Sequence, residues 1–329
     1  MSDKIRTGVV GVGGLGQHHL RWLTQIPNSE CVGFYDTDTK RSQEMAKKHS
    51  VPWFGLLEEL LEKAQMLSIV VPTTLHYEVA AQAIAAGVHC LIEKPVTVTV
   101  DEALKLASLA EKHKVKVAVG QIERFNPAVR ALMARGIRPA FIEAHRLAAF
   151  NPRGTDVAVV LDLMIHDIDL CLMLTGSRPV DIHASSVGVI SRQADIANAR
   201  LTFENGAVAN LTASRISLGA MRKVRIFEKS GYFSLDLAKK QADLYSLDST
   251  GKAGEGMRIP LGASGENLVY QKVGDDGQDM LGLEIQTFLN AIAEDRPVAV
   301  SLSDGTEALR VALEVERIGQ ESLEKMLEG

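Results

Sequence analysis

The stretch "GVVGVGGLGQHH", residues 8–19, decides the fold of the first part of the chain. From Gly11 to Gly16 it has the spacing G-x-G-x-x-G, directly after an apolar run and before a segment with helical periodicity. The first glycine of this spacing permits a tight turn, the second a close backbone approach, and the third close helix packing. The stretch therefore predicts a strand, a loop and a helix whose amino end meets phosphates. The alternative is a glycine-rich turn that serves packing alone.

Asp36 supports the phosphate-binding interpretation. It ends the next apolar run, "CVGFYD", 20 residues after Gly16. A carboxylate at this place binds the ribose hydroxyls of NAD and repels the additional phosphate of NADP. NAD is therefore favoured, but Lys40 and Arg41 follow closely and could bind the additional phosphate of NADP, so NADP is not excluded. Alternatively, Asp36 only starts a turn or caps the next helix. The predicted cofactor-binding residues here are Gly11, Val12, Gly13, Gly14, Leu15, Gly16, Asp36 and Arg41.

Up to residue 120, short apolar runs alternate with amphipathic segments. Near-continuous apolar strands joined by helices indicate a parallel sheet that is covered on both faces. Residues 1–120 are therefore predicted to form a doubly wound, Rossmann-type α/β domain. Residues 121–329 change to longer alternating runs, with the turn signals "ENG" (204–206) and "KSG" (229–231), and end in two helical segments. This second part predicts an α+β domain with a mostly antiparallel sheet.

The composition excludes several classes of protein. The chain has 329 residues, a formal net charge of −5 and no basic patch, which argues against nucleic acid as a partner. Its three cysteines lie far apart in apolar runs, as expected in a reducing compartment. No apolar run reaches membrane-spanning length, and the start is a strand and turn rather than a signal peptide. A cytoplasmic protein without membrane contact is expected.

Three further strand ends carry candidate ligand-binding residues, because ligands of parallel sheets bind beyond the carboxyl ends of the strands. "IVVPTTLHYE" ends its strand at Pro72, and Thr73 and Thr74 are either ligands or helix caps. "HCLIEKPVT" ends at Glu93 and Lys94, and the proline after Lys94 favours an extended backbone there. The cofactor-binding residues predicted from these ends are Pro72, Thr73, Thr74, His76, Glu93, Lys94 and Gln121.

The stretch "VVLDLMIHDIDLCLML", residues 159–174, is apolar on nearly every side yet contains a histidine and three carboxylates. On one helix, Asp162, His166 and Asp169 fall within a narrow stripe, whereas Asp167 points the other way. Since buried carboxylates need partners, the stripe faces a polar network, a metal or an active site. No H-E-x-x-H and no cysteine pair supplies further metal ligands, so no metal is expected.

The combined motifs resemble the Gfo/Idh/MocA family of oxidoreductases over nearly the whole chain. The resemblance rests on G-x-G-x-x-G, on P-T-x-x-H after the fourth strand, on E-K-P, and on D-x-x-x-H-x-x-D in the second part. It implies a Rossmann domain followed by an α/β domain with a large, open, mostly antiparallel sheet, which in this family often forms dimers or tetramers. It also implies hydride transfer at a carbinol carbon of a sugar or cyclitol.

The resemblance implies a set of catalytic residues. Lys94 corresponds to the E-K-P lysine, and Asp162 and His166 correspond to the D-x-x-x-H pair. A histidine suits removal of a hydroxyl proton near neutral pH. An aspartate one turn earlier can orient the imidazole, and a lysine can hold or polarise the substrate oxygen. The alternative is a purely structural polar network; Asp169 fits either role.

Within the family, the sequences of residues 159–170, 195–217 and 222–227 resemble the branch that oxidises UDP-N-acetylglucosamine at C3 for lipid A synthesis. A diphosphate would need cationic partners, for which Arg124, Arg146, Arg153 and Arg215 are candidates. The predicted substrate-binding residues are Lys94, Arg124, Arg153, Asp162 and His166. Free sugars or inositol remain alternative substrates, and an NAD-dependent glycosidase or a non-catalytic dinucleotide-binding regulator are alternative classes. A homodimer or homotetramer is expected.

Overall fold

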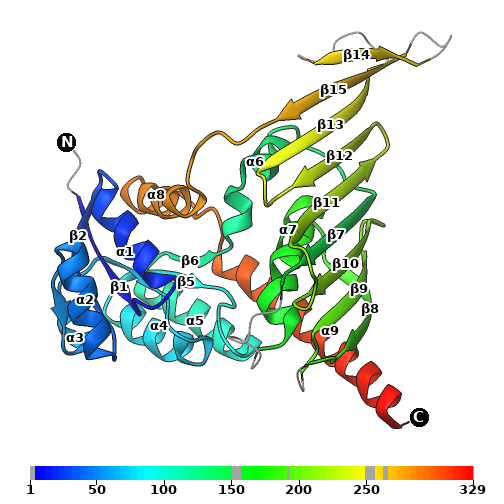
Figure 1. The fold of residues 1–329 in the computed structure, drawn as a ribbon. Coiled ribbons are helices and arrows are strands. Elements are labelled where there is room, and N and C mark those ends of the chain that lie inside the picture. Colours follow the sequence, from blue (N-terminus) through cyan, green and yellow to red (C-terminus); the bar gives the residue numbers. More distant parts are fainter. Residues whose placement is uncertain (1–3, 150–156, 191–192, 249–255, 262–265, 329) are drawn as a thin grey trace. The chain divides into compact units, whose positions relative to one another are not determined.

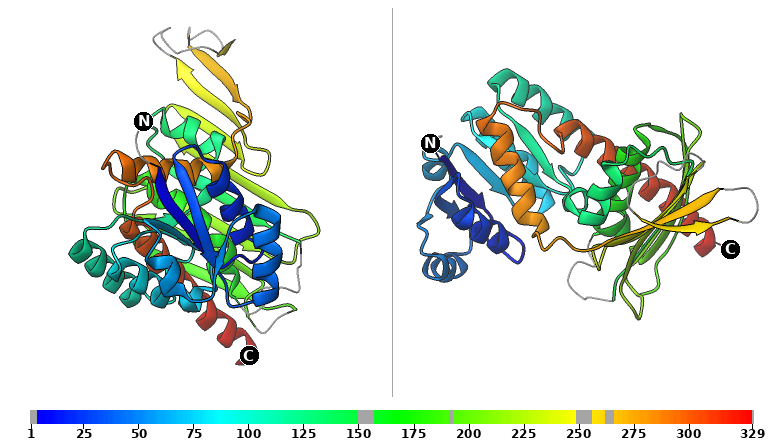
Figure 2. Two further views of the ribbon diagram at one scale, coloured as in Figure 1. Left: turned by 90° about the vertical axis from the view of Figure 1, so that its left-hand side faces the viewer. Right: turned by 90° about the horizontal axis from the view of Figure 1, so that it is seen from above.

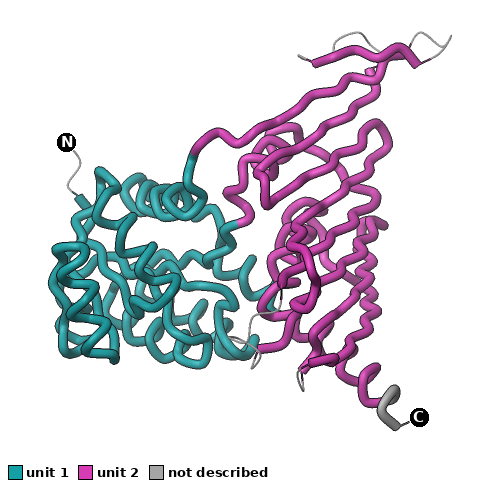
Figure 3. Tube along the Cα trace, viewed as in Figure 1, with its two compact units in different colours: residues 1–122, 278–309 teal, residues 123–277, 310–329 magenta. Residues whose placement is uncertain are grey.

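The computed structural model describes residues 4–149, 157–190, 193–248, 256–261 and 266–328, and the chain forms two compact units (Figure 3). Unit 1 consists of residues 1–122 and 278–309, and unit 2 of residues 123–277 and 310–329. The first crossing lies close to the sequence-based boundary at residue 120. Residues 278–309, which the sequence analysis assigned to the second part, cluster with unit 1 instead.

Unit 1 contains a six-stranded sheet in which every strand pair is parallel (Figure 1). Its strands are β1 (Ile5–Val10), β2 (Ser29–Tyr35), β3 (Trp53–Phe54), β4 (Met66–Ile69), β5 (His89–Glu93) and β6 (Val117–Gly120). They lie in the order β3-β2-β1-β4-β5-β6, which is the doubly wound order of dinucleotide-binding folds. The predicted Rossmann sheet is thus confirmed. The strand order reverses between β1 and β4.

The helices of unit 1 connect and cover these strands. They are α1 (Gly16–Gln25), α2 (Thr39–His49), α3 (Leu57–Leu61), the 3-10 turn η1 (Thr73–Leu75), α4 (His76–Ala85), α5 (Val100–His113), α8 (Met280–Ala293) and the start of α9 (Leu302–Glu328). α1 packs against α8 (Figure 2). A Cβ on Gly282 of α8 would lie 2.9 Å from the ring of Trp22 of α1. Apolar side chains from both helices complete one buried cluster with β1 and β2. Only glycine permits so close an approach of the α8 backbone.

Unit 2 is built on a nine-stranded sheet. Its strands are β7 (Phe141–Leu147), β8 (Pro179–Val187), β9 (Ile196–Phe203), β10 (Val208–Ser214), β11 (Met221–Glu228), β12 (Gly231–Asp236), β13 (Gln241–Asp248), β14 (Met257–Pro260) and β15 (Asn267–Val273). The order is β14-β15-β13-β12-β11-β7-β10-β9-β8, and β7/β10 is the parallel pair in an otherwise antiparallel sheet. The predicted mostly antiparallel sheet and its turns at "ENG" and "KSG" are confirmed.

One face of the unit 2 sheet carries helices and the other carries a row of aromatic rings. The helical elements of this unit are η2 (Ile122–Phe125), α6 (Pro127–Met133), the π turn η3 (Val160–Met164), α7 (Ile165–Thr175) and the remainder of α9. Alternation along β7 buries Ile142, Ala144 and Arg146 towards α7. The opposite face presents five rings in register across five strands, namely Phe141, Phe227, Tyr232, Tyr245 and Tyr270.

The helix expected over 159–174 is not one regular α-helix. It begins with a π turn in which the N–H of Ile165 donates to the carbonyl of Val160, five residues back. The 3.6-residue periodicity used for the predicted stripe therefore applies only from Ile165 onward. Among the described helices, none combines the length and the apolar character needed to cross a bilayer.

Candidate functional site

The loop after β1 has the shape that its glycines predict. Gly11 has φ +86°, and a Cβ there would lie 2.5 Å from the carbonyl oxygen of Val70. A Cβ on Gly16 would overlap the carbonyl oxygen of Gly11 at 1.8 Å, so the start of α1 packs directly on the loop. Around Gly13 and Gly14, by contrast, a Cβ would meet nothing within 4 Å. These two positions leave space for a ligand to approach the backbone.

Asp36 is tied to this loop. Its Oδ2 accepts a hydrogen bond of 2.8 Å from the N–H of Val12, and its Oδ1 accepts one of 2.8 Å from the N–H of Asp38. The helix cap of α2 is Asp38 and not Asp36, which removes the capping alternative. Arg41 lies 3.3 Å from both carboxylate oxygens of Asp36. Thus the acid and the base weighed for NAD and NADP form one ion pair.

Two further observations in unit 1 fit a dinucleotide. No side chain caps the amino end of α1, so no side chain competes with an anion at this helix end. Oε1 of Gln121, at the end of β6, is buried and has no hydrogen-bond partner within the described residues. A buried acceptor of this kind suits an amide donor such as a nicotinamide carboxamide. The residues present therefore fit the pyrophosphate and one donor group of NAD.

The segment after β4 does not use its threonines as helix caps. The cap positions of η1 and α4 are Pro72 and Leu75, and neither has a side-chain cap bond. His76 is buried, with Nδ1 2.8 Å from the carbonyl oxygen of Pro95 and Nε2 2.9 Å from that of Val71. Burial lowers the pKa of His76 despite both carbonyls. The predicted ligand His76 thus links the β4 and β5 strand ends.

Glu93 ends β5 and Lys94 follows it, and the Lys94–Pro95 peptide bond is cis. Oε1 of Glu93 lies 3.1 Å from Nε2 of His19, a fully buried residue of α1. Oε2 of Glu93 accepts a hydrogen bond of 3.3 Å from the backbone N–H of Lys94. The side chain of Glu93 therefore points back into the unit.

In unit 2, Asp162 and His166 occupy different helical turns. Asp162 is exposed and belongs to the π turn, whereas His166 is half-buried in the first turn of α7. Insertions of this kind are frequent at functional sites, because the wider turn re-aims one side chain relative to the next. Asp162 and His166 keep the four-residue spacing that the family motif requires.

The two other carboxylates of α7 are held by arginines. Asp169 accepts two hydrogen bonds from Arg124 of η2, from Nε at 2.8 Å and from Nη2 at 2.6 Å. Asp167 accepts two from Arg146 of β7, from Nε at 3.0 Å and from Nη2 at 2.8 Å. Burial raises the pKa of Asp167, and Arg146 opposes that shift. The sequence left a polar network, a metal or an active site open for these carboxylates. Asp167 and Asp169 face arginines in a polar network.

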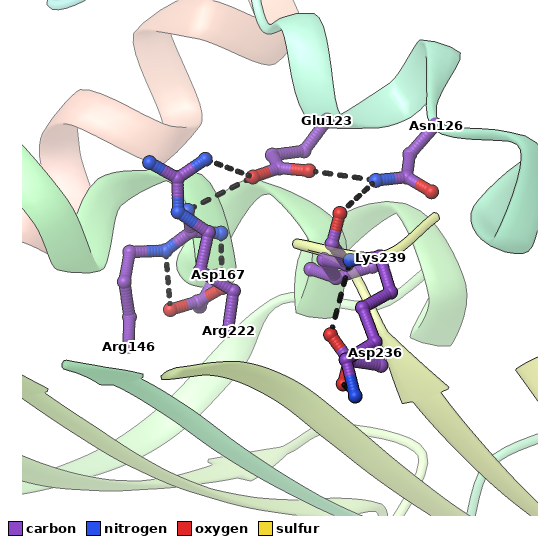
Figure 4. Close-up of polar contacts among 8 residues, drawn as sticks. Glu123, Asn126, Arg146, Asp167, Arg222, Asp236 and Lys239 are labelled. Atoms are coloured by element: carbon purple, nitrogen blue, oxygen red, sulfur yellow. Dashed lines mark hydrogen bonds and ion pairs between the residues drawn. The ribbon is translucent and has the colours of Figure 1, made fainter. Parts of the chain in front are cut away.

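Glu123 joins the second pair into a buried network (Figure 4). Its Oε1 accepts a hydrogen bond of 2.9 Å from Nη1 of Arg146 and lies 3.7 Å from Nη1 of Arg222. Its Oε2 accepts one of 3.2 Å from Asn126, which also donates to the carbonyl of Leu237. Burial works against the charge of Arg146, yet Asp167 and Glu123 together raise its pKa above the ordinary value.

The arginines considered for a diphosphate are thus engaged within unit 2. Arg124 and Arg146 make the pairs just described, and Arg215 donates to the carbonyl of Ala194 at 2.8 Å and lies 3.5 Å from Asp195. Arg153 lies outside the described residues. Substrate binding by Arg124 or Arg153 stays a prediction.

Sequence reasoning did not assign roles to His19 or Glu123. His19 lies within the quoted "GQHH", at a position where an amphipathic helix faces its sheet, and this was the available signal. Glu123 gives no comparable signal, because its charged partners, Arg146 of β7 and Arg222 of β11, are distant in sequence.

A parallel sheet of this order, with an open glycine loop and an acid at the second strand end, defines a dinucleotide-binding protein of the Rossmann type. Residues 5–121 match the oxidoreductase family with an NAD-binding Rossmann fold, GFO_IDH_MocA, and residues 129–234 match the GFO/IDH/MocA C-terminal domain. The chain belongs to this family of oxidoreductases, which confirms the resemblance inferred from its motifs.

One similar protein covers nearly the whole chain, and a second covers 72% of it. UDP-N-acetylglucosamine 3-dehydrogenase of Acidithiobacillus ferrooxidans is 41% identical over 312 residues, which are 94% of this chain and 96% of that protein. An uncharacterised oxidoreductase of Bacillus subtilis, YrbE, is 26% identical over 72% of this chain and 75% of its own length.

Solved structures agree with the fold. A structure of the Acidithiobacillus ferrooxidans enzyme superposes with a TM-score of 0.88 at 38% identity, covering 97% of this chain and 99% of that one. Levoglucosan dehydrogenase in complex with NADH and levoglucosan has a TM-score of 0.83 at 18% identity, covering 97% and 98% of the two chains. At that identity the second likeness establishes the fold alone.

Proposed function

We propose that the protein is an NAD-dependent dehydrogenase that oxidises the C3 hydroxyl of UDP-N-acetylglucosamine. The observation that carries the proposal is the 41% identity with an enzyme of that activity over 94% of the chain. Asp36, which is hydrogen-bonded to the glycine loop of unit 1, supports NAD as the cofactor, since its carboxylate disfavours an additional phosphate on the ribose. The 3-keto product would serve an aminotransferase in lipid A synthesis.

His166 is proposed as the base that takes the hydroxyl proton, because an imidazole exchanges protons near neutral pH. When bound, NAD would supply the acceptor for the hydride of the carbinol carbon. Lys94 holds and polarises the substrate oxygen through its ammonium group, and Asp162 orients His166. The family motif supports this assignment, as does the half-buried position of His166 in the first turn of α7.

The nucleotide part of the substrate requires cationic groups for its diphosphate. Arg124 and Arg153 are the proposed ones. Arg124 can contribute only while it remains paired with Asp169, because removing one member of a buried pair leaves an uncompensated charge.

The test is a cofactor-reduction assay followed by absorbance. Purified protein is mixed with NAD, and in parallel with NADP, and receives UDP-N-acetylglucosamine, N-acetylglucosamine, glucose or myo-inositol. A second series adds 2-oxoglutarate, so that a tightly held and recycled cofactor does not hide turnover. The proposal expects reduction of NAD with UDP-N-acetylglucosamine and a 3-keto product by NMR.

Other outcomes would redirect the proposal. Reduction with a free sugar or inositol alone would keep the dehydrogenase and discard the nucleotide sugar. Release of an aglycone from a glycoside without net reduction would indicate a glycosidase. Binding of NAD without any turnover would indicate a regulator.

We also propose that the protein is a homodimer or homotetramer that associates through the aromatic row of unit 2. Five neighbouring rings on the sheet face opposite α7 support this, with adjacent centroids 4.8–5.8 Å apart. Aromatic residues are enriched at protein interfaces. Light scattering after gel filtration gives the parent mass, and Tyr245→Lys should produce monomers. A monomeric parent would refute the proposal.

A further inference from the structure

Lys94 lies between two backbone positions that are each held by a buried histidine. The residue before it, Glu93, contacts His19 of α1 through its carboxylate. The residue after it, Pro95, contacts His76 of α4 through its carbonyl oxygen. All of these residues belong to unit 1. The inference below rests on the proposed role of Lys94.

The contact on the Glu93 side involves three elements. His19 is fully buried, and its Nδ1 has no hydrogen-bond partner in the part of the chain that the structure describes. Nε2 is the ring nitrogen that faces the carboxylate of Glu93, and a proton on Nε2 makes this contact a hydrogen bond. β6 completes the arrangement, since a Cβ on Gly120 would lie 2.9 Å from Oε1 of Glu93. The carboxylate fits only because residue 120 has no side chain.

The contact on the Pro95 side joins two strand ends. His76 is almost fully buried, and its ring lies between the carbonyl oxygens of Pro95 and Val71 at 2.8 and 2.9 Å. A neutral imidazole donates to only one of them, so one contact is a hydrogen bond and the other a close approach. The contact that matters for Lys94 is the one with Pro95.

We propose that His19 and His76 are positioning residues that fix the backbone on either side of Lys94. They thereby fix the Cα atom from which the side chain and its ammonium group extend. A lysine side chain is long and flexible, so the position of its ammonium group can be defined only if the position of its Cα atom is fixed. Burying two imidazoles where leucine would fill the space carries a desolvation cost, which their polar contacts offset. A misplacement of about 1 Å can lower turnover about 100-fold.

The first experiment compares substitutions of His19. His19→Leu removes the donor to Glu93, whereas in His19→Gln the side-chain amide reaches the place of Nε2 and can donate. Steady-state kinetics with UDP-N-acetylglucosamine and direct binding of NADH by fluorescence are measured for both. We expect His19→Leu to lower kcat up to about 100-fold, with KM and NADH binding little changed. His19→Gln should recover most of the kcat.

The second experiment moves the carboxylate and leaves the histidine in place. Gly120→Ala introduces a methyl group against Oε1 of Glu93, the far end of a side chain that can shift without unfolding the unit. A loss of kcat similar to that of His19→Leu is expected. This variant keeps the proposal testable if His19→Leu fails to fold.

The third experiment separates the two contacts of His76. The amide of asparagine lies near the place of Nδ1, and that of glutamine near Nε2. If the contact with Pro95 positions Lys94, His76→Asn retains kcat and His76→Gln loses it. The reverse order would overturn the assignment of His76.

A matched control lies at the other end of the same strand. His89 begins β5, and its Nδ1 accepts a hydrogen bond of 2.8 Å from the N–H of Lys116. His89→Leu removes a histidine contact from β5 far from Lys94, and should lower stability without lowering kcat. Equal losses of kcat in His89→Leu and His19→Leu would mean that His19 serves only stability.

The inference and the proposed function fail in different ways. If Lys94→Met keeps its turnover, the role of Lys94 is wrong. If Lys94→Met is inactive while His19→Leu, Gly120→Ala and His76→Gln keep the parent kcat, only the positioning role is wrong.

Discussion

The surroundings of Lys94 in unit 1 and those of His166 in unit 2 are held by different chemistry. Next to Lys94, the contacts run through imidazole rings, one carboxylate and backbone carbonyls. Next to His166, the neighbouring carboxylates of α7 form bidentate ion pairs with arginines from η2 and β7. One region is held by hydrogen bonds with little charge, the other by buried ions.

The difference predicts different consequences of damage. Losing a hydrogen bond of the first kind costs little stability on average, about 0.5–1.5 kcal/mol, so its effect should appear mainly in the reaction. Removing one member of a buried ion pair leaves a charge without compensation, so its effect should appear mainly in folding. Four predictions, from the largest effect to the smallest, test this contrast.

The largest effect is expected on turnover. Lys94→Met and His166→Asn remove the two proposed reacting groups, one in each unit, and each should lower kcat by about 10²–10⁴-fold. Matched controls are Lys105→Met on the exposed side of α5 and His183→Asn on β8, both of which should keep the parent kcat. Steady-state assays decide, and near-parent rates in both test variants would reject the proposed chemistry.

The next effect is expected on stability in unit 2. Arg146→Met leaves Asp167 and Glu123 buried without their counterion, and should lower the free energy of unfolding by about 3–5 kcal/mol. The control is Arg225→Met on β11, whose exposed pair with Glu143 at 3.3 Å is worth about 0.2–1 kcal/mol. Urea unfolding measures both, and equal losses would contradict the network's role.

A smaller effect is expected on cofactor choice. Asp36→Asn keeps an acceptor for the N–H of Val12 and removes the negative charge, which also frees Arg41. The ratio of kcat/KM for NADP to that for NAD should rise about tenfold or more, since a charged hydrogen bond contributes about 1.5–3 kcal/mol. An unchanged ratio would mean that Asp36 acts only within the loop.

The smallest effect is expected on the pH dependence of stability. Burial lowers the pKa of His76 in the folded protein, so the unfolded chain binds its proton more readily. Stability from this group is present above the ordinary histidine pKa of about 6.5 and is lost as the pH falls below it. Unfolding curves of the parent should therefore weaken more steeply towards acid pH than those of His76→Asn. If the stabilities of the parent and of His76→Asn depend on pH in the same way, the lowered pKa of His76 is rejected.

Much of unit 1 follows from its sequence because its information is local. The glycine spacing, the position of Asp36 and the alternating apolar runs each specify structure within a few residues, and the parallel sheet follows. In unit 2 the strands β13, β14 and β15 lie beyond the runs identified from sequence. All four residues of β14 are exposed, so no alternation of buried and exposed positions marks it, and its pairing with β15 defines it as a strand.

The candidate site divides in the same way. Lys94, Asp162 and His166 are predictable as motif residues, but their surroundings are not. The π turn at Val160–Met164 leaves no mark in the periodicity of the stretch. The partners of Asp169 and Glu93 come from segments 45 and 74 residues away, and such pairs depend on the folded chain alone.

Glu123 is the first residue of unit 2, and it lies at the centre of the buried network of that unit. Anyone who divides the gene to produce the second half separately has to respect this. A fragment cut at the family boundary, residue 129, would lack the carboxylate of Glu123 and the guanidinium of Arg124. Arg146 would lose one counterion and Asp169 its arginine, and leaving these buried groups without their partners is costly. Residues 123–128, which lie between the two family matches, therefore belong to the fold of unit 2.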